Sequence, residues 1–175
     1  MTEQAEMERT EHGLVPSSEG WFAVSLAEAR WGTHERYGEW CAFEGKPGFA
    51  QVGINLHVLA PGQPNGMYHR EDQQEDYLVL EGECLLLVEG DERRLRQWDF
   101  FHAAPGTEHI FLGAGDGPCA ILMVGARDPD KEIFYPRNEL ALSHRAGVET
   151  EVSSPEEAHA TDVPPGPAWA PDLFR

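Results

Sequence analysis

Short apolar runs alternate with turn signals between residues 49 and 126, and this pattern restricts the fold more than any other feature of the sequence. The runs are rich in valine, isoleucine and leucine, as strands are, and comprise Gln51–Leu59, Tyr77–Leu80, Cys84–Val88 and Ala120–Val124. Turn-forming pairs and clusters separate them, at Pro61-Gly62, Pro64–Gly66, Glu81-Gly82, Gly90-Asp91 and Gly113–Gly117. Gly90-Asp91 stands between two apolar runs and predicts a two-residue hairpin. No long helical pattern interrupts the series, so we predict an all-β sandwich or barrel.

The segments on either side of this region differ from it in composition. Residues 1–14 are rich in charge and contain almost nothing apolar to bury, so we predict a flexible acidic arm over residues 1–20. The barrel domain, with a leading helix and strand, is predicted to span residues 21–127. A C-terminal extension, residues 128–175, follows it. The chain is therefore expected to hold one barrel and two terminal arms.

Local signals predict a few elements outside the barrel proper. Ser25–Trp31 begins with a capping box, in which Glu28 follows the serine by three residues, and it predicts a short helix. The aromatic-rich segment Tyr37–Phe43 predicts a first strand. Ser154–Glu157 offers an N-cap serine, a proline at the first helical position and acidic residues in the first turn, so a second short helix is expected. The proline-rich stretch 161–175 predicts an extended tail on the surface.

The charge balance excludes one class of partner. Thirty-one acidic residues against thirteen basic ones give a formal net charge of −18, which repels a nucleic-acid backbone. The longest apolar run is too short for a membrane span, and the acidic N-terminus resembles neither a secretory signal nor a transit peptide. We therefore predict a cytoplasmic protein that binds neither nucleic acid nor membrane. The three cysteines fit no disulfide framework or zinc motif and are expected to be buried thiols.

Spaced histidine and acidic residues mark the stretch from His69 to Gly82. His69 is followed by Glu71 two residues later, by Glu75 after another four, and by Gly82 after another seven. This spacing resembles the first motif of the cupin superfamily, H-x-H, three or four residues, E, six residues, G. Glu71 occupies the place of the second histidine, and Gln63 stands where the family motif opens with a glycine.

A second stretch resembles the second cupin motif, G, five residues, P-x-G-x-x-H-x-x-x-N. Gly106 and His109 match it, Pro105 lies one position from the expected proline, and Gly113 replaces the asparagine. The resemblance covers roughly residues 45–126. It implies a specific all-β fold, a double-stranded β-helix or jelly-roll barrel. Together with the flanking signals, it predicts this barrel with short terminal helices and extended N- and C-terminal arms.

Strand geometry gives a physical reason for these spacings. Residues two apart in a strand face the same side, so His69 and Glu71 would point into one interior. Glu75 and His109 each begin a further strand. A barrel brings strands that are distant in sequence together, and two imidazoles and a carboxylate can then bind one ion at about 2.0–2.2 Å. We predict that His69, Glu75 and His109 hold one divalent transition metal, Fe, Mn, Ni or Zn.

Glu71 departs from the family pattern, and three alternatives remain open for it. It can be a fourth metal ligand, which would give a set of two histidines and two glutamates. It can instead be a catalytic base or substrate contact beside a two-histidine, one-carboxylate set with open positions. Alternatively, its side chain turns away and pairs with a nearby cation.

The strand before Pro61-Gly62 has two faces, and either can form the pocket wall. In relatives the face of Leu59 usually looks into the pocket, which would make Asn55 and His57 substrate-binding residues. Alternatively, the face formed by Ile54, Leu56 and Val58 fills the core. In the first case the outer apolar face needs a cover, from an N-terminal arm or a second subunit, and this favours a homodimer. Tyr77 and Phe111 complete the predicted substrate-binding set.

The predicted function is that of a metal-dependent enzyme acting on a small organic molecule, with an oxygenase as the first choice. The metal would activate dioxygen, or act as a Lewis acid with Glu71 as proton acceptor. The resemblance implies oxygenases, sugar isomerases and decarboxylases as relatives, and the fold alone does not select one. Two alternatives are a non-catalytic metal- or small-ligand-binding module and a Lewis-acid isomerase of a sugar-like substrate. A phosphosugar is disfavoured, because strand alternation points Arg70 away from the interior.

Overall fold

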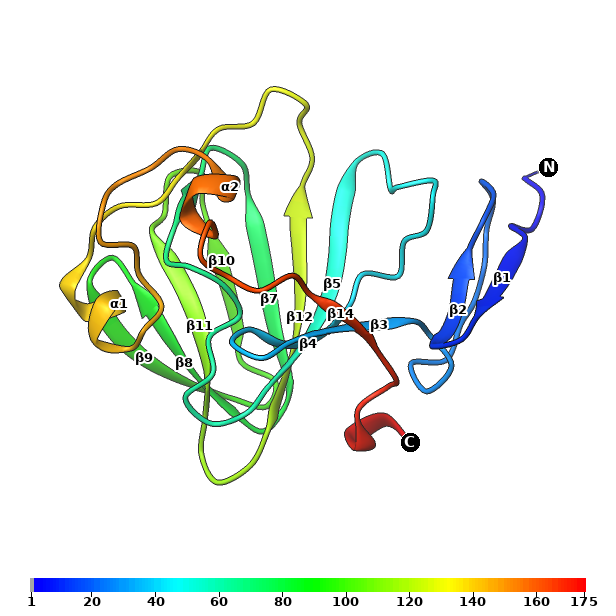
Figure 1. Ribbon diagram of the computed structural model, residues 1–175, viewed down its shortest axis with the longest axis horizontal. Coiled ribbons are helices and arrows are strands. Elements are labelled where there is room, and N and C mark those ends of the chain that lie inside the picture. Colours follow the sequence, from blue (N-terminus) through cyan, green and yellow to red (C-terminus); the bar gives the residue numbers. More distant parts are fainter. Residues whose placement is uncertain (1) are drawn as a thin grey trace.

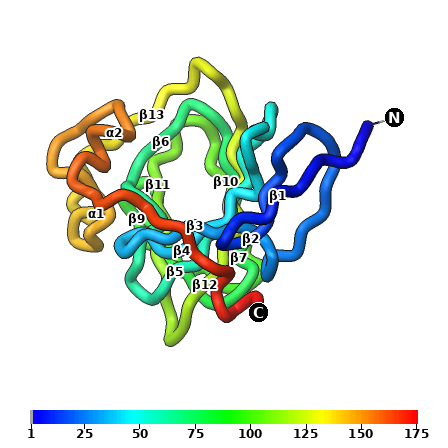
Figure 2. Tube along the Cα trace, turned by 45° about the vertical axis from the view of Figure 1, so that its right-hand side comes forward, coloured from blue at the N-terminus to red at the C-terminus, as the bar shows by residue number. Residues whose placement is uncertain are grey.

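Two facing sheets form a barrel, which Figure 2 shows nearly end on. The structure is a computed structural model that describes residues 2–175, and Met1 lies outside the described residues. The larger sheet has seven strands, in the order β10 (Phe100–Ala103), β7 (Glu75–Glu81), β12 (Cys119–Ala126), β5 (Val52–Leu59), β4 (Gly38–Cys41), β3 (Trp31–His34) and β14 (Gly166–Ala168). The smaller sheet consists of β11 (His109–Ala114), β8 (Glu83–Val88) and β9 (Asp91–Arg96), and a short pair joins β6 (Arg70–Glu71) to β13 (Ile133–Phe134). The predicted all-β jelly-roll barrel is confirmed.

The register of β12 decides which side chains face the barrel interior. Its residue Met123 lies opposite Asn55 on β5 and opposite Tyr77 on β7. Side chains of directly opposed residues point to the same face of a sheet. Next along β12, on the same face, Ile121 lies opposite His57. The face that carries Asn55, His57 and Leu59 therefore looks inward, which is the first of the two alternatives drawn from the sequence.

The outer face of β5 is covered by the chain itself. Leu56 and Val58 form a buried cluster with Trp31, Cys41, Ala29, Ala120 and Ala170. Trp31, which is 1% exposed, stacks on Phe174 with ring centroids 5.5 Å apart. Figure 1 shows the C-terminal tail, in red, crossing beside β3 and β4. Because the terminal segments bury this face, it no longer argues for a second subunit, and the homodimer stays a prediction.

The N-terminal arm is more ordered than the sequence predicts. Strands β1 (Met7–Thr10) and β2 (Gly13–Pro16) form a hairpin, which lies at the edge of the molecule near the N-terminus (Figure 1). The prediction that residues 1–14 lack structure is wrong for these strands. Their order depends on tertiary contacts: Val15 is 6% exposed, and the Leu14 backbone pairs with residues near Ala29.

The predicted helix over Ser25–Trp31 is also wrong. The Ala29 amide donates to the Ser25 carbonyl at 2.9 Å, so one turn forms. The Arg30 amide then donates to the Leu14 carbonyl at 3.0 Å, and β3 begins at Trp31. Pairing with the arm thus replaces the helical hydrogen bonds that local sequence favours.

Other local predictions hold more closely. Helix α2 (Pro155–Ala158) is capped by Ser154, whose hydroxyl accepts from the Glu157 amide, as predicted. The hairpin between β8 and β9 turns on Glu89 and Gly90, one residue before the predicted pair, and both have positive φ, 50° and 82°. Helix α1 (Glu139–Ser143) and the 3-10 helix η1 (Asp172–Phe174) were not predicted.

The state of the cysteines and the length of the helices bear on two expectations drawn from composition. Cys41, Cys84 and Cys119 are buried free thiols, which confirms the prediction for the cysteines. Within residues 2–175, no helix has the length and apolar character needed to cross a membrane.

If the terminal segments cover the outer face of β5, Leu56→Ala should behave as a core substitution. Leu56 is 1% exposed, and we expect the free energy of unfolding to fall by about 2–4 kcal/mol. Leu173→Ala is the control, because Leu173 is 39% exposed, and it should change this free energy by less than about 0.5 kcal/mol. Urea titration measures both. A Leu56→Ala loss as small as that of the control would mean that the face is open to solvent.

Candidate metal centre

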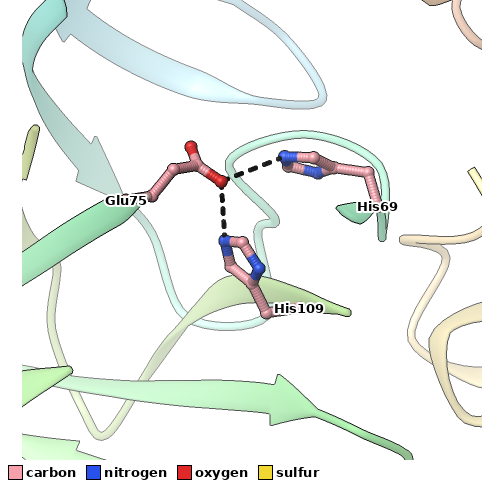
Figure 3. A group of neighbouring side chains, drawn as sticks. All are labelled: His69, Glu75 and His109. Atoms are coloured by element: carbon pink, nitrogen blue, oxygen red, sulfur yellow. Dashed lines mark ion pairs between the residues drawn. The ribbon is translucent and has the colours of Figure 1, made fainter. Parts of the chain in front are cut away.

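Three side chains from separate segments converge inside the barrel (Figure 3). His69 lies just before β6, Glu75 is the first residue of β7, and His109 is the first residue of β11. The Glu75 carboxylate oxygen Oε2 is 3.9 Å from His69 Nε2 and 3.4 Å from His109 Nε2. One donor atom from each residue lies within 4.8 Å of the others. A central cation could draw these atoms in by the small movement that coordination distances of about 2.0–2.2 Å require.

Backbone contacts hold the two imidazoles in matching orientations. His69 Nδ1 lies 2.8 Å from the Met67 carbonyl, and His109 Nδ1 lies 3.0 Å from the Thr107 carbonyl. A carbonyl can only accept, so each Nδ1 carries the proton and donates. Each Nε2 therefore carries the lone pair of its ring, and both nitrogens lie near the Glu75 carboxylate. Histidines that bind metals commonly use this arrangement, in which the second ring nitrogen donates to a carbonyl.

Burial disfavours the charged form of all three groups. It lowers the pKa of His69 and of His109, so both rings are held neutral and ready to donate lone pairs. Burial also raises the pKa of Glu75, because a carboxylate is poorly solvated there. Two neutral imidazoles beside a carboxylate in an apolar interior are costly unless a partner balances them. The donor set therefore fits a divalent metal ion.

Tyr77 adds a hydroxyl to this group. Its Oη lies 2.6 Å from His109 Nε2, and its ring packs on Phe111 with centroids 4.7 Å apart. Burial raises the pKa of Tyr77 well above its ordinary value, so the hydroxyl is protonated and donates to the ring nitrogen. The sequence singled out Tyr77 as part of the pocket wall, and its contact with His109 is a feature that sequence reasoning missed.

Glu71 does not belong to the converging group. Its carboxylate is largely buried and accepts two hydrogen bonds from Lys131 Nζ, at 2.8 and 2.9 Å. This is the third of the alternatives drawn from the sequence, pairing with a nearby cation. Lys131 follows β12 and lies sixty positions after Glu71 in the sequence, so no local pattern identified it as the partner. The ligand and catalytic roles of Glu71 stay predictions.

Asn55 and His57 line a cavity of about 490 Å³ at one side of the barrel. The rest of its wall comes from His34, Tyr37, Trp40, Asn65, His159 and Asp162–Pro165. Sequence reasoning assigned no role to His34 or His159. Phe111 is fully buried beneath Tyr77, so it supports that ring and does not line this cavity. The substrate-binding roles of all four residues stay predictions.

The cavity and the converging group are close in the sheet. Asn55 lies opposite Met123, and Met123 lies opposite Tyr77, which contacts His109. Adjacent strands are about 4.8 Å apart, so Asn55 and Tyr77 stand roughly 10 Å from each other on the same inner face. Tyr77 is buried and does not itself line the cavity, so Met123 separates the two on the inner face.

Comparison with known proteins identifies the barrel. Residues 55–125 match the family model described as a cupin domain. No curated protein sequence matches the chain. Among solved structures, a sugar phosphate isomerase from a cupin superfamily, from Silicibacter pomeroyi, aligns with a TM-score of 0.53 and 22% identity, over 74% of this chain and 79% of that one.

Two further structures align over a smaller part of the chain. An RmlC-like cupin family protein with a double-stranded β-helix fold, from Methanocaldococcus jannaschii, has a TM-score of 0.43 and 17% identity, over 47% of this chain and 76% of that one. A DMSP lyase from Ruegeria pomeroyi has a TM-score of 0.41 and 24% identity, over 47% of this chain and 42% of that one. At these identities the likeness concerns the fold alone. Residues 55–125 are matched by the cupin-domain model and lie in two facing sheets closed as a jelly roll, so the barrel of this chain is a cupin domain.

Proposed function

We propose that this chain is a metal-dependent enzyme that acts on a small organic molecule, with His69, Glu75 and His109 as the metal ligands. The observation that carries the proposal is the convergence of two oriented Nε2 lone pairs on one carboxylate, at 3.9 and 3.4 Å. Two imidazoles and a carboxylate suit Fe, Mn, Ni or Zn, and such an ion supplies Lewis acidity to a substrate that chelates it. The neighbouring cavity supports catalysis over storage, because a purely structural site needs no room for a substrate.

The residues around the site favour a proton-transfer reaction. Tyr77 holds a protonated hydroxyl 2.6 Å from His109 Nε2. When this nitrogen serves as a metal ligand, it no longer accepts from Tyr77, and the hydroxyl can exchange a proton with a bound substrate. Both carboxylate oxygens of Glu71 are already engaged by Lys131, so Glu71 is less available to a substrate than Tyr77. Isomerisation and elimination at a carbon next to a chelating carbonyl or carboxylate are reactions of this type.

An oxygenase is the second candidate. Two histidines and one carboxylate with open positions form the ligand set typical of non-haem Fe(II) oxygenases. The two candidates differ in a directly measurable way, because an oxygenase consumes dioxygen and a proton-transfer enzyme does not. A small-molecule screen with metal-loaded protein, run in air and under nitrogen, separates them.

A phosphosugar remains the less favoured substrate. One similar structure is a sugar phosphate isomerase, but its 22% identity to this chain concerns the fold alone. Arg70 points outward, where it contacts Glu108 at 3.1 Å and the ring of Phe134. Among the residues that the structure describes, no lysine or arginine lines the cavity beside Asn55 and His57.

His69→Ala and His109→Ala should each abolish stoichiometric metal in protein purified without chelator. Each substitution removes one of three donors, and two donors hold a divalent ion weakly. His102→Ala is the matched control: His102 is exposed, pairs with Asp76 at 2.7 Å and should leave the metal content unchanged. Elemental analysis measures all three. Full metal content in both site variants would refute the proposed ligand set.

Tyr77→Phe should keep the metal and lower kcat by roughly 10²–10⁴-fold on a substrate found by the screen. The ring and its packing on Phe111 are retained, and only the hydroxyl is lost. Metal content and thermal stability serve as controls for the site. An unchanged kcat would remove Tyr77 from the reaction, and turnover that ceases under nitrogen would favour the oxygenase.

Glu71→Gln should retain the metal, because the Lys131 ammonium group already engages the carboxylate. Lys131→Met is the companion variant, since it frees Glu71 without altering the three proposed ligands. Metal content is measured in both. A loss of metal from Glu71→Gln alone would instead make Glu71 a fourth ligand, as one of the sequence alternatives holds.

A further inference from the structure

The cavity beside Asn55 has walls of two different origins. Asn55, His57 and Asn65 come from the part of the chain that matches the cupin domain. The rest of the wall comes from outside it: His34, Tyr37 and Trp40 in the β3–β4 hairpin, and His159 and Asp162–Pro165 from the C-terminal segment. This chain therefore builds much of the cavity from segments that the shared domain does not supply.

The charges at the cavity are already paired. Asp162 is the one residue with a formal charge among its described lining residues. One of its oxygens accepts from Tyr37 at 2.6 Å and from His159 at 2.8 Å, and the other accepts from Arg36 at 3.0 Å. The Arg36 guanidinium also donates to the Arg145 carbonyl at 2.7 Å. A charged group of a ligand would therefore find no unpaired opposite charge among the described residues that line the cavity.

One polar group at the cavity lacks a partner. His57 Nδ1 is buried and has no hydrogen-bond partner among the described residues. Buried polar atoms are rarely left unpaired, so such an atom points to a ligand or a water that the chain is built to bind. Burial lowers the pKa of His57 to about 4, so the ring is neutral at physiological pH and offers one donor and one acceptor. The amide of Asn55, two residues away on the same face, also offers both.

An aromatic surface lies beside these groups. The Trp40 and His57 rings are nearly parallel, with an interplanar angle of 22° and centroids 6.3 Å apart. The Tyr37 ring also lines the cavity, and it stacks on His34 at 4.7 Å. Flat ligand groups pack well on such rings. The cavity thus combines aromatic faces, neutral hydrogen-bonding groups and the absence of free charge among the described lining residues.

We infer that this cavity binds an uncharged, flat, hydrogen-bonding portion of a small molecule, such as an aromatic amide, and that His57 and Asn55 recognise it. A charged portion such as a phosphate is rejected, because its desolvation would not be balanced. The identification of this molecule as the substrate rests on the proposed function. The binding itself does not, because none of the cavity residues is a proposed metal ligand.

Four matched probes test the inference: benzamide, benzoate, phenyl phosphate and benzamidine. They share a phenyl ring and differ in charge. The full chain, labelled with ¹⁵N, is titrated with each, and the indole N–H signal of Trp40, assigned with Trp40→Phe, reports the site. We expect benzamide to shift this signal and to bind at least about tenfold more tightly than each charged probe. Equal or tighter binding of a charged probe, an unmoved Trp40 signal, or no binding of benzamide at millimolar concentration would overturn the inference.

Variants separate this site from the metal centre. His57→Phe and, independently, Asn55→Leu should weaken benzamide binding at least about tenfold, and His102→Gln should not. His69→Ala should lose the metal and keep benzamide binding. If His69→Ala keeps its metal while the benzamide results hold, the proposed function fails and the cavity assignment stands. If both cavity variants bind benzamide as the wild type does, with native-like spectra, the cavity assignment fails whatever the metal result.

Discussion

The antiparallel pairing of β12 with β5 on one side and β7 on the other is the constraint on which the rest of the structure depends. It aligns Asn55, Met123 and Tyr77 across three strands on the inner face. A shift of one residue in this register would turn the same side chains outward. The pairing therefore fixes two features at the same time. Asn55, at one end of this row of three residues, lines the cavity, and Tyr77, at the other end, places its hydroxyl beside His109.

The converging group owes its form to the backbone as much as to its side chains. The His69 amide donates to the His109 carbonyl at 3.2 Å, and the His109 amide donates to the His69 carbonyl at 2.8 Å. These two hydrogen bonds hold the two chain segments side by side. Carbonyls of Met67 and Thr107, each two residues before a histidine, then fix the rings. Burial keeps both imidazoles neutral, so the energetic cost of gathering them near Glu75 is offset when a cation is present.

Much of the barrel could be predicted from the sequence, because strand runs and turn pairs are local signals. The converging residues His69, Glu75 and His109 could also be predicted, since two spaced motifs bring them together. What failed depends on distant contacts. The Ser25 turn has the composition of a helix start, but Arg30 pairs with Leu14 in the arm. Lys131 reaches Glu71 across sixty positions, and His159 and Asp162 reach the cavity from beyond α2. No local periodicity encodes such pairings.

The cavity wall combines residues of the cupin domain with residues from segments outside it, so the two parts of the wall can diverge separately. Glu75 and His109 begin strands whose pairing also holds the barrel together, and His69 pairs with His109, so the barrel constrains the positions of all three. Tyr37, His159 and Asp162 belong to a hairpin and a tail that lie beyond residues 55–125. Substitutions in these flanking segments can therefore reshape the cavity while the strands that gather His69, Glu75 and His109 keep their pairing.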